Sequence, residues 1–380
     1  MNGILKKARQ AADENKIASY KEEIQLAYIS VQGRNNDENT IFQQTKQSLE
    51  QTGKYSVTVY NDSATIISNN DKYVFEIVDD NTEYRGIQKV TTNAEPLMMA
   101  RTNNYYAFWN EEIRTKITRI ETRNYMVYDS DIIQEWDVSK NKDKSVIAYI
   151  TDDGNSGYNL YIVANGKIKM QPDGKSFFEN FFNVTQMDLK NLDTSALTTM
   201  ENMFYADNSL LELNLSSFDT SNVTNMSNMF CNCKQLQQIN FKNFDTSNAE
   251  NMFNMFYGCT ALTKLDLSSF NTSKVTNFSQ MFRGCSSFEI LDISSFTLDS
   301  LTTAVGMFGW CGKLKTIYAN DKFTFNENIS TANMFIACGK LVGGQGTTWK
   351  GNIDYELYAH IDGGPSNPGY FTYKTTPSNI

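Results

Sequence analysis

The chain of 380 residues contains one histidine, His360, and only five prolines. GxSxG, HExxH, P-loop and dinucleotide-binding glycine motifs do not occur in it, and His360 has no recognisable nucleophile beside it. Carboxylates are numerous enough for a glycosidase pair, since many glycosidases need only two, but their scatter singles out no pair. We therefore expect no enzymatic activity and no cofactor.

Excess positive charge and long apolar runs are also lacking. The formal net charge is −9, which argues against nucleic acid or an anionic membrane surface as a partner and favours basic ligands or neutral glycans. No apolar window of about 18 residues occurs, and the segment MNGILKK has no apolar stretch. We expect a membrane link only through an anchor absent from this chain. The oligomeric state is not determined by the sequence.

What the chain does have is a repeat of 26 residues. Its copies begin at Met187, Leu213, Ile239, Leu265, Leu291 and Ile317. In the copy LNLSSFDTSNVTNMSNMFCNCKQLQQ, Leu213 and Leu215 alternate around Asn214, which predicts a short strand. Further on, Met226, Met229 and Phe230 have the spacing of a short helix or 3₁₀ turn. A constant period of this kind predicts a solenoid of stacked coils.

Apolar residues recur in register and predict a continuous core. One expected column is Phe218, Phe244, Phe270 and Phe296, and another is Met203, Met229, Met255, Met281, Met307 and Met334. Cys233, Cys259, Cys285, Cys311 and Cys338 share one repeat position, where the first copy has Asp207. We interpret these cysteines as reduced packing residues, because only Cys231 and Cys233 approach a zinc pattern and no second pair accompanies them. No metal site is expected.

The segments LSSFDTSNVTNMSNMF and LSSFNTSKVTNFSQMF resemble the 26-residue repeat of BspA-like leucine-rich-repeat bacterial surface proteins. The segment YAFWNEEIRTKITRI resembles the lead-in region of that family, and YAHIDGGPSNPGYFT resembles its terminator. The resemblance implies a non-catalytic solenoid on the bacterial exterior. The N-terminal segment NGILKKARQAADENKIASYKEEIQLAYISVQ is also similar to the helix that follows the membrane anchor in pilin-like clostridial surface proteins.

These patterns predict an α+β fold, a leucine-rich-repeat solenoid with a short strand and a helix or 3₁₀ turn per coil, preceded by a small α/β module and an N-terminal helix. The expected domains are an amphipathic helix (1–33), a small α/β module (34–96), an N-terminal cap (97–186), six repeats (187–343) and a C-terminal cap (344–380). The N-terminal helix is a membrane-proximal stalk or part of a coiled coil. The TTNAEP stretch before Leu97 is the expected linker.

The candidate binding residues lie between the two buried positions of each predicted strand. They form an expected solvent-facing column of Asp188, Asn214, Asn240, Asp266, Asp292 and Tyr318. The alternative is a solvated strand face without a ligand. Loop aromatics form a second candidate patch, Tyr205, Tyr257 and Trp310. The DTS column, Asp193, Asp219, Asp245 and Asn271, is expected to bond its own turns.

Two functions fit the sequence. The first is a cell-surface binding or adhesion protein that recognises an extracellular host protein, a glycan or another microbe. The alternative is a structural pilin-like or envelope-assembly component that displays the repeats. Both place the chain on the outside of a bacterial cell.

Overall fold

The computed structural model describes residues 2–32, 38–59, 64–69, 73–78, 80–87, 98, 111–126, 131–351 and 355–374. The chain divides into two compact units. The first comprises Met1–Asn93, Asn124–Ile132 and Val163–Gly166, and the second comprises Ala94–Arg123, Ile133–Ile162 and Lys167–Ile380. None of the described helices is long and apolar enough to cross a membrane.

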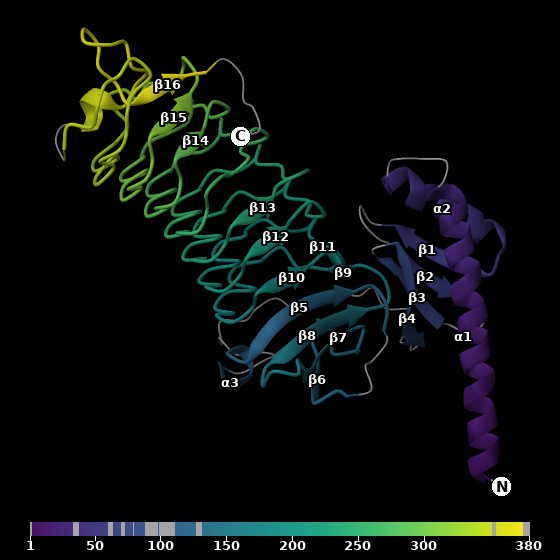
Figure 1. The fold of residues 1–380 in the computed structure, drawn as a ribbon. Helices are drawn as coiled ribbons and strands as arrows, with labels where there is room; N and C mark the ends of the chain where they lie inside the picture. The colour runs from purple at the N-terminus through teal and green to yellow at the C-terminus, as the bar shows by residue number, and fades with distance from the viewer. Residues whose placement is uncertain are drawn as a thin grey trace. The chain divides into compact units, whose positions relative to one another are not determined.

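The first unit packs two helices on an antiparallel sheet (Figure 1). Helices α1 (Asn2–Gln32) and α2 (Glu38–Gln51) precede β1 (Tyr55–Val59), β2 (Ala64–Ser68), β3 (Tyr73–Val78) and β4 (Asn81–Ile87), which pair in that order. The core of this unit joins Ile24 and Tyr28 of α1 to Phe42 of α2 and Phe75 of β3.

Both helices and the first three strands of this unit match the sequence pattern, which has helical spacing in residues 4–31 and 41–49 and predicts strands at 55–60, 64–67 and 73–78. Strand β4 was not predicted, because its sequence NTEYRGI is largely polar. Its Thr82 is fully buried, and the Tyr84 ring packs against Phe75 with centroids 5.5 Å apart. Gly33, which the sequence favours as a helix stop, and Asp37, which it favours as an N-cap, lie outside the described residues, as does the expected TTNAEP linker.

The second unit begins with the short helix α3 (Glu111–Arg114) and a five-stranded sheet. This sheet has the order β10 (Gln186–Asp188), β5 (Ile117–Arg123), β8 (Tyr158–Ala164), β7 (Val146–Asp152) and β6 (Gln134–Asp137). The alternating residues 145–150 and 158–163 on either side of DDGNSG predict a hairpin, and the structure confirms it, since β7 and β8 are neighbours joined by that turn. Strand β10 pairs in parallel with β5, so the first repeat residues extend this sheet.

The remaining strands form small parallel sheets. Strand β9 (Ile168–Lys169) pairs with β11 (Leu192–Asp193), and β12 (Glu212–Asn214) pairs with β13 (Gln238–Asn240). Near the C-terminus, a three-stranded sheet consists of β14 (Ile290–Asp292), β15 (Thr316–Ala319) and β16 (Phe371–Tyr373). The short 3₁₀ helix η1 (Tyr355–Tyr358) lies between β15 and β16 in the chain. The 26-residue period is visible in single parallel bridges, such as Thr199 to Asn225 and Asn225 to Asn251.

The predicted fold class, a leucine-rich-repeat solenoid with a helix or 3₁₀ turn in each coil, is wrong. The described residues form several small separate sheets, and Lys264–Asp266, where a strand was expected, belong to none of them. Residues 187–343 are all described and contain turns where the helices were expected.

Backbone conformation explains why no helix forms. Asn228 and Asn232 have φ values of 55° and 63°, in the left-handed region that ends a right-handed helix. The N–H groups of these two residues donate to the carbonyls of Phe253 and Tyr257, 25 residues further on, at 2.8 and 2.7 Å. The N–H of Met229, between them, closes a local turn on the carbonyl of Met226. Some backbone N–H groups of this segment therefore bond within the turn, and others bond to the next repeat.

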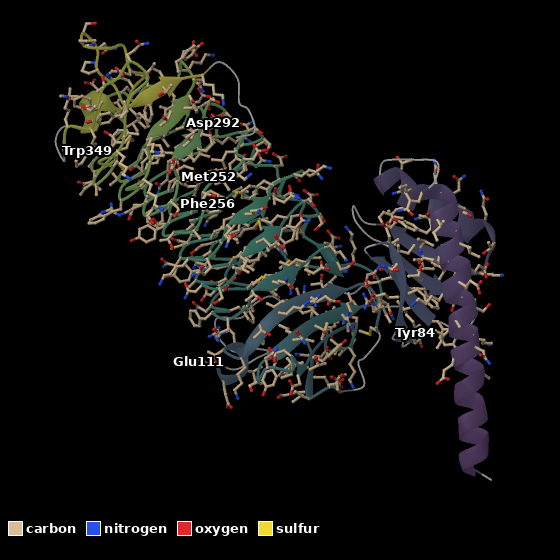
Figure 2. All side chains as sticks on the ribbon, in the orientation of Figure 1. Tyr84, Glu111, Met252, Phe256, Asp292 and Trp349 are labelled. Atoms are coloured by element: carbon tan, nitrogen blue, oxygen red, sulfur yellow. The ribbon has the colours of Figure 1, made fainter. Side chains whose placement is uncertain are left out.

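The predicted apolar columns are confirmed as core. All six methionines of the Met column and all four phenylalanines of the Phe column are buried, and Figure 2 marks two further fully buried side chains of the repeats, Met252 and Phe256. Successive rings also stack at the phenylalanine that follows each methionine of the Met column: Phe230 and Phe256 lie 5.4 Å apart, and Phe256 and Phe282 lie 5.6 Å apart. Each repeat buries its apolar side chains against its neighbours.

The cysteines are buried and free, as expected. Each thiol of the column also donates to a carbonyl of the preceding repeat. The Sγ of Cys259 lies 3.0 Å from the carbonyl oxygen of Phe230, and that of Cys285 lies 3.0 Å from the oxygen of Phe256. Burial raises the pKa of the Cys338 thiol to about 12, so it stays protonated at neutral pH. Burial and this raised pKa both disfavour thiolate chemistry.

The C-terminal segment covers the last repeat, as expected of a C-terminal cap, and does so with Trp349, Tyr370 and Phe371. The Tyr370 and Phe371 rings pack edge-on against Phe335, with centroids 5.1 and 5.7 Å apart. The indole N–H of Trp349 donates to the carbonyl of Phe335 at 3.1 Å. These contacts give the final repeat the apolar neighbour that a further repeat would otherwise supply.

Candidate functional site

A groove of about 490 Å³ lies on the outer face of the first parallel strands. It is lined by Arg119 of β5 and by all residues of β10, β12 and β13. Because side chains alternate along a strand, the middle residues Met187, Leu213 and Ile239 point toward the core and the flanking residues point outward. The groove is therefore bordered by two rows of polar side chains.

The groove contains three of the six predicted site residues. Asp188, Asn214 and Asn240 form one of its rows, and the structure brings them together as the 26-residue register predicted. Asp266 is exposed but does not line this groove, since its repeat lacks the strand. Tyr318 is only partly exposed.

Asp292 corrects the prediction of a solvent-facing column. Its side chain is buried, with 9% of the residue exposed, and its Oδ2 atom lies 2.7 Å from Nζ of Lys374 (Asp292 is labelled in Figure 2). Burial opposes ionisation of this carboxyl, but hydrogen bonds from Lys374 and Ser294 outweigh it and lower the pKa of Asp292. Lys374, which directly follows the C-terminal strand β16, thus lies over Asp292.

The predicted column also stabilises its own turns. One side-chain oxygen of each Asp and Asn in the column accepts the N–H two residues later, for example Asn214 from Ser216 at 3.0 Å and Asp266 from Ser268 at 3.0 Å. The side-chain amide groups of Asn214 and Asn240 donate no hydrogen bond within the described part of the chain. The turn therefore fixes the side chain and leaves its amide group toward the groove.

The expectation for the DTS column is confirmed. The carboxylate of Asp219 accepts the N–H and the hydroxyl of Ser221, at 3.1 and 2.6 Å. The following threonine links repeats, because the Thr220 hydroxyl donates to the carbonyl of Asp245 and accepts its N–H, both at 2.8 Å. These residues hold the turns together.

The second row of the groove was not predicted. It consists of Gln186, Glu212 and Gln238, each of which precedes the first buried residue of its strand. Strand alternation was the available signal, since the positions on both sides of Leu213 point outward. Arg119 was missed as well, because β5 lies outside the repeats.

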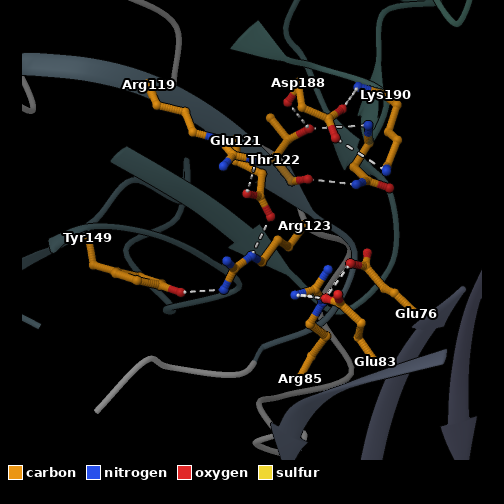
Figure 3. A network of polar contacts seen from close by, with 11 residues as sticks. Glu76, Glu83, Arg85, Arg119, Glu121, Thr122, Arg123, Tyr149, Asp188 and Lys190 are labelled. Carbon is orange, nitrogen blue, oxygen red and sulfur yellow. Dashed lines mark hydrogen bonds and ion pairs between the residues drawn. The ribbon is translucent and has the colours of Figure 1, made fainter. Parts of the chain in front are cut away.

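A network of charges fixes the Arg119 end of the groove (Figure 3). Glu121 accepts from both Arg119 and Arg123, at 3.2 and 2.7 Å. Arg123 also donates to the Tyr149 hydroxyl at 3.0 Å. On the β10 side, Lys190 lies 3.2 Å from Asp188. Each of these charged side chains thus has an oppositely charged neighbour within the protein.

The Glu212 side chain differs from the other carboxylates near the groove. It is exposed, and it forms no hydrogen bond or ion pair with any described residue. Gln238 is its register partner on the adjacent strand, and Gln186 lines the same groove. The lining thus offers one unpaired carboxylate among four side-chain amides, which suits recognition by hydrogen bonds.

The second predicted patch, formed by loop aromatics, is not a single row. Trp310 is 55% exposed and has a φ of 64°, at the repeat position of Gly258 and Gly284. Tyr205 and Tyr257 occupy the preceding repeat position and are only partly exposed. Among the described residues, no group of three or more His, Cys, Asp or Glu side chains is placed to hold a metal ion.

The comparisons with known proteins find one family. Residues 173–266 and 264–349 each match the family described as "Mycoplasma protein of unknown function, DUF285". The two matches cover the repeats and the groove strands β10, β12 and β13. No curated protein and no solved structure matches the chain. The chain therefore carries repeats similar to those of a family whose function is unknown, and its relation to leucine-rich-repeat proteins is not established.

Proposed function

We propose that the chain is a non-catalytic binding protein at a bacterial cell surface, and that the groove over β10, β12 and β13 holds an extracellular protein or glycan. The observation that carries this proposal is the in-register pair of polar rows bordering the groove. Rows separated by about 4.8 Å meet an elongated ligand at several points at once.

The chemistry of the lining supports binding in preference to catalysis. Its polar side chains are amides, two carboxylates and one guanidinium, without a nucleophile paired to a base. The surface location rests on the resemblance of the repeats to those of bacterial surface proteins. The partner is then an extracellular molecule, with no role for nucleic acid.

An array of glycans and matrix proteins, probed with the purified chain, tests this proposal. A ligand captured by the native chain should be lost by the double variant Gln186→Ala, Gln238→Ala. The matched control is Gln134→Ala, Gln345→Ala, which removes two exposed amides outside the groove. Capture that survives in the groove variant, or that fails equally in the control, would contradict the proposed site.

A structural role in a surface assembly is the second candidate, and helix α1 favours it. The helix begins at Asn2, and Ile17 is its first described side chain that packs against the core of the first unit (Figure 1). Leu26 and Ile29 are more than half exposed on the same helix. Filaments or helix-mediated oligomers seen by electron microscopy or light scattering would support this role, and their loss on deleting residues 2–16 would assign it to α1.

A further inference from the structure

A lysine of the chain itself is bound on the outer face of the strands. Strand β16 pairs in parallel with β15, with Thr372 opposite Tyr318. Lys374 then turns back over this face, where Nζ lies 2.7 Å from Oδ2 of Asp292 and 4.9 Å from the centroid of the Tyr318 ring. The ammonium group is thus held by an outward-facing carboxylate and an aromatic face.

Asp292 has the same repeat position as the groove residues Asp188, Asn214 and Asn240. All four occupy the last position of a three-residue strand and accept the N–H two residues later. The face that binds Lys374 near the C-terminus is therefore the face that forms the groove in the first repeats. The bound lysine shows one kind of group that this surface accommodates.

The groove contains a carboxylate that lacks such a partner. The acids around it are paired, Asp188 with Lys190 and Glu121 with Arg119 and Arg123. Glu212 has no partner within the described residues. The side chain of its register partner Gln238 offers a carbonyl oxygen beside it, as does that of Gln186 in the same groove. An ammonium group donates three hydrogen bonds and needs acceptors of this kind.

We infer that the groove binds a lysine side chain from an extended segment of a partner protein, with Glu212 as the ion-pair partner and the amide oxygens of Gln186 and Gln238 as further acceptors. This inference rests on the proposed function and specifies its ligand. The net charge of −9 favours the approach of a basic segment.

A pair of synthetic peptides tests the inference on the full chain. The probe is an acetylated and amidated peptide of alternating lysine and alanine, and its control replaces each lysine by Nε-acetyllysine, which removes the charge. Fluorescence anisotropy at low salt should show binding of the lysine peptide and weaker binding of the acetyllysine peptide. The dissociation constant should also rise with salt, since the contact is an ion pair at an open surface.

Two variants with the same change of charge locate the contact. Glu212→Gln keeps a carbonyl acceptor but removes the charge, and it should raise the dissociation constant for the lysine peptide about three- to fivefold, the loss expected for an exposed ion pair worth up to about 1 kcal/mol. Glu250→Gln removes an exposed carboxylate outside the groove and should change the constant by less than about twofold. Thermal unfolding checks that both variants are folded, which is expected because both side chains are exposed.

No binding of the lysine peptide, equal binding of the acetyllysine peptide, or an unchanged constant in Glu212→Gln would each overturn the inference. The proposed function has a separate outcome. If an array ligand is still lost in Gln186→Ala, Gln238→Ala, the groove remains the binding site and only the lysine assignment fails. If that capture is also unaffected, both fail.

Discussion

The carboxylate of Asp362 holds the C-terminal segment together. It accepts the N–H groups of Gln345, Thr347 and Gly364, at 2.8, 3.0 and 3.0 Å, and the Thr347 hydroxyl at 2.7 Å. Burial opposes ionisation, but these hydrogen bonds outweigh it and lower the pKa of Asp362 to about 2. One charged side chain thus joins segments 345–347 and 362–364.

This residue should make stability depend on acid. An aspartate in an unfolded chain has a pKa of about 3.9, so the stabilisation by Asp362 is fully present above about pH 4 to 5 and is lost as the pH falls toward 2. Linkage puts the effect at about 2 to 3 kcal/mol. Asp362→Asn should lower the free energy of unfolding in urea near neutral pH and reduce its fall in acid.

The control for this measurement is Asp321→Asn, which changes an exposed carboxylate in the last repeat. Its pH profile of unfolding should follow that of the native chain. Parallel profiles for the native chain and Asp362→Asn would show that Asp362 does not stabilise the fold through its charge.

At the scale of single residues, the sequence predicted which residues share a row better than it predicted the partners of each side chain. Strand alternation and the 26-residue register placed Asp188, Asn214 and Asn240 in one row, because both depend only on local geometry. The same reasoning failed for Asp292, since its partner Lys374 lies 82 residues away and reaches it through the C-terminal strand. A pattern of spacing could equally not show that Glu212 forms no ion pair with any described residue.

At the scale of elements, the error about helices has a clear cause. A series of tight turns places apolar side chains inward every three or four residues, as one face of a helix does. The spacing of Met226, Met229 and Phe230 therefore fits a helix and a series of turns equally well. The distinguishing signal was the recurrence of Asn and Gly at two positions per repeat, as at Asn228 and Gly258, which have φ values of 55° and 70°. These residue types tolerate the left-handed region best.

A matched pair of glycines tests this description of the turns. Gly258 has a left-handed backbone, and an added Cβ atom would lie 2.6 Å from Oδ1 of Asn232, whereas a Cβ atom at Gly312 would meet nothing within 4 Å. Gly258→Ala should therefore lower the free energy of unfolding by about 1 to 2 kcal/mol or more. Gly312→Ala should leave it within about 1 kcal/mol of the native value, with stabilisation possible.

Chemical denaturation of the two variants under the same conditions gives the comparison. Equal stability of Gly258→Ala and Gly312→Ala would mean that the left-handed turn at Gly258 is not required by the fold.

At the scale of the whole molecule, the first unit is assembled from separated parts of the chain. It includes Asn124–Ile132, in which Tyr125 is fully buried and clusters with Val74 of β3. The predicted domains 34–96 and 97–186 are consecutive in the chain. A prediction of this form cannot show that Asn124–Ile132 belongs to the same unit as residues 34–93. The domain boundaries remain predictions, since the expected linker lies outside the described residues.

Removal of the N-terminal part should therefore have a local effect. A fragment that begins at Met98 lacks Val74, so Tyr125 loses its buried neighbour, while the repeats keep their own core of stacked Met and Phe side chains. Hydrogen exchange should increase in a peptide that covers Asn124–Met126 and stay unchanged in the repeats from residue 213 onward. Loss of protection throughout the repeats would show that the second unit depends on the first.

The sequence predicted those features of the whole chain that recur in every repeat. It did not predict features that depend on contacts between distant segments. The six-fold recurrence of a 26-residue pattern identified the repeats and their core, and the family match covers the same residues. The interruption of the sheet at Lys264–Asp266 and the cover over Asp292 are single events, so periodicity gave no sign of them.

The central claim is that the face over β10, β12 and β13 is where this chain binds its partner, and a photo-crosslink measures it most directly. A photoreactive amino acid at position 238 lies in the groove, and the same amino acid at position 134 lies on β6, outside it. With the ligand selected by the array, we predict a crosslink from position 238 and none above background from position 134. A crosslink from position 134 with none from position 238 would contradict the account.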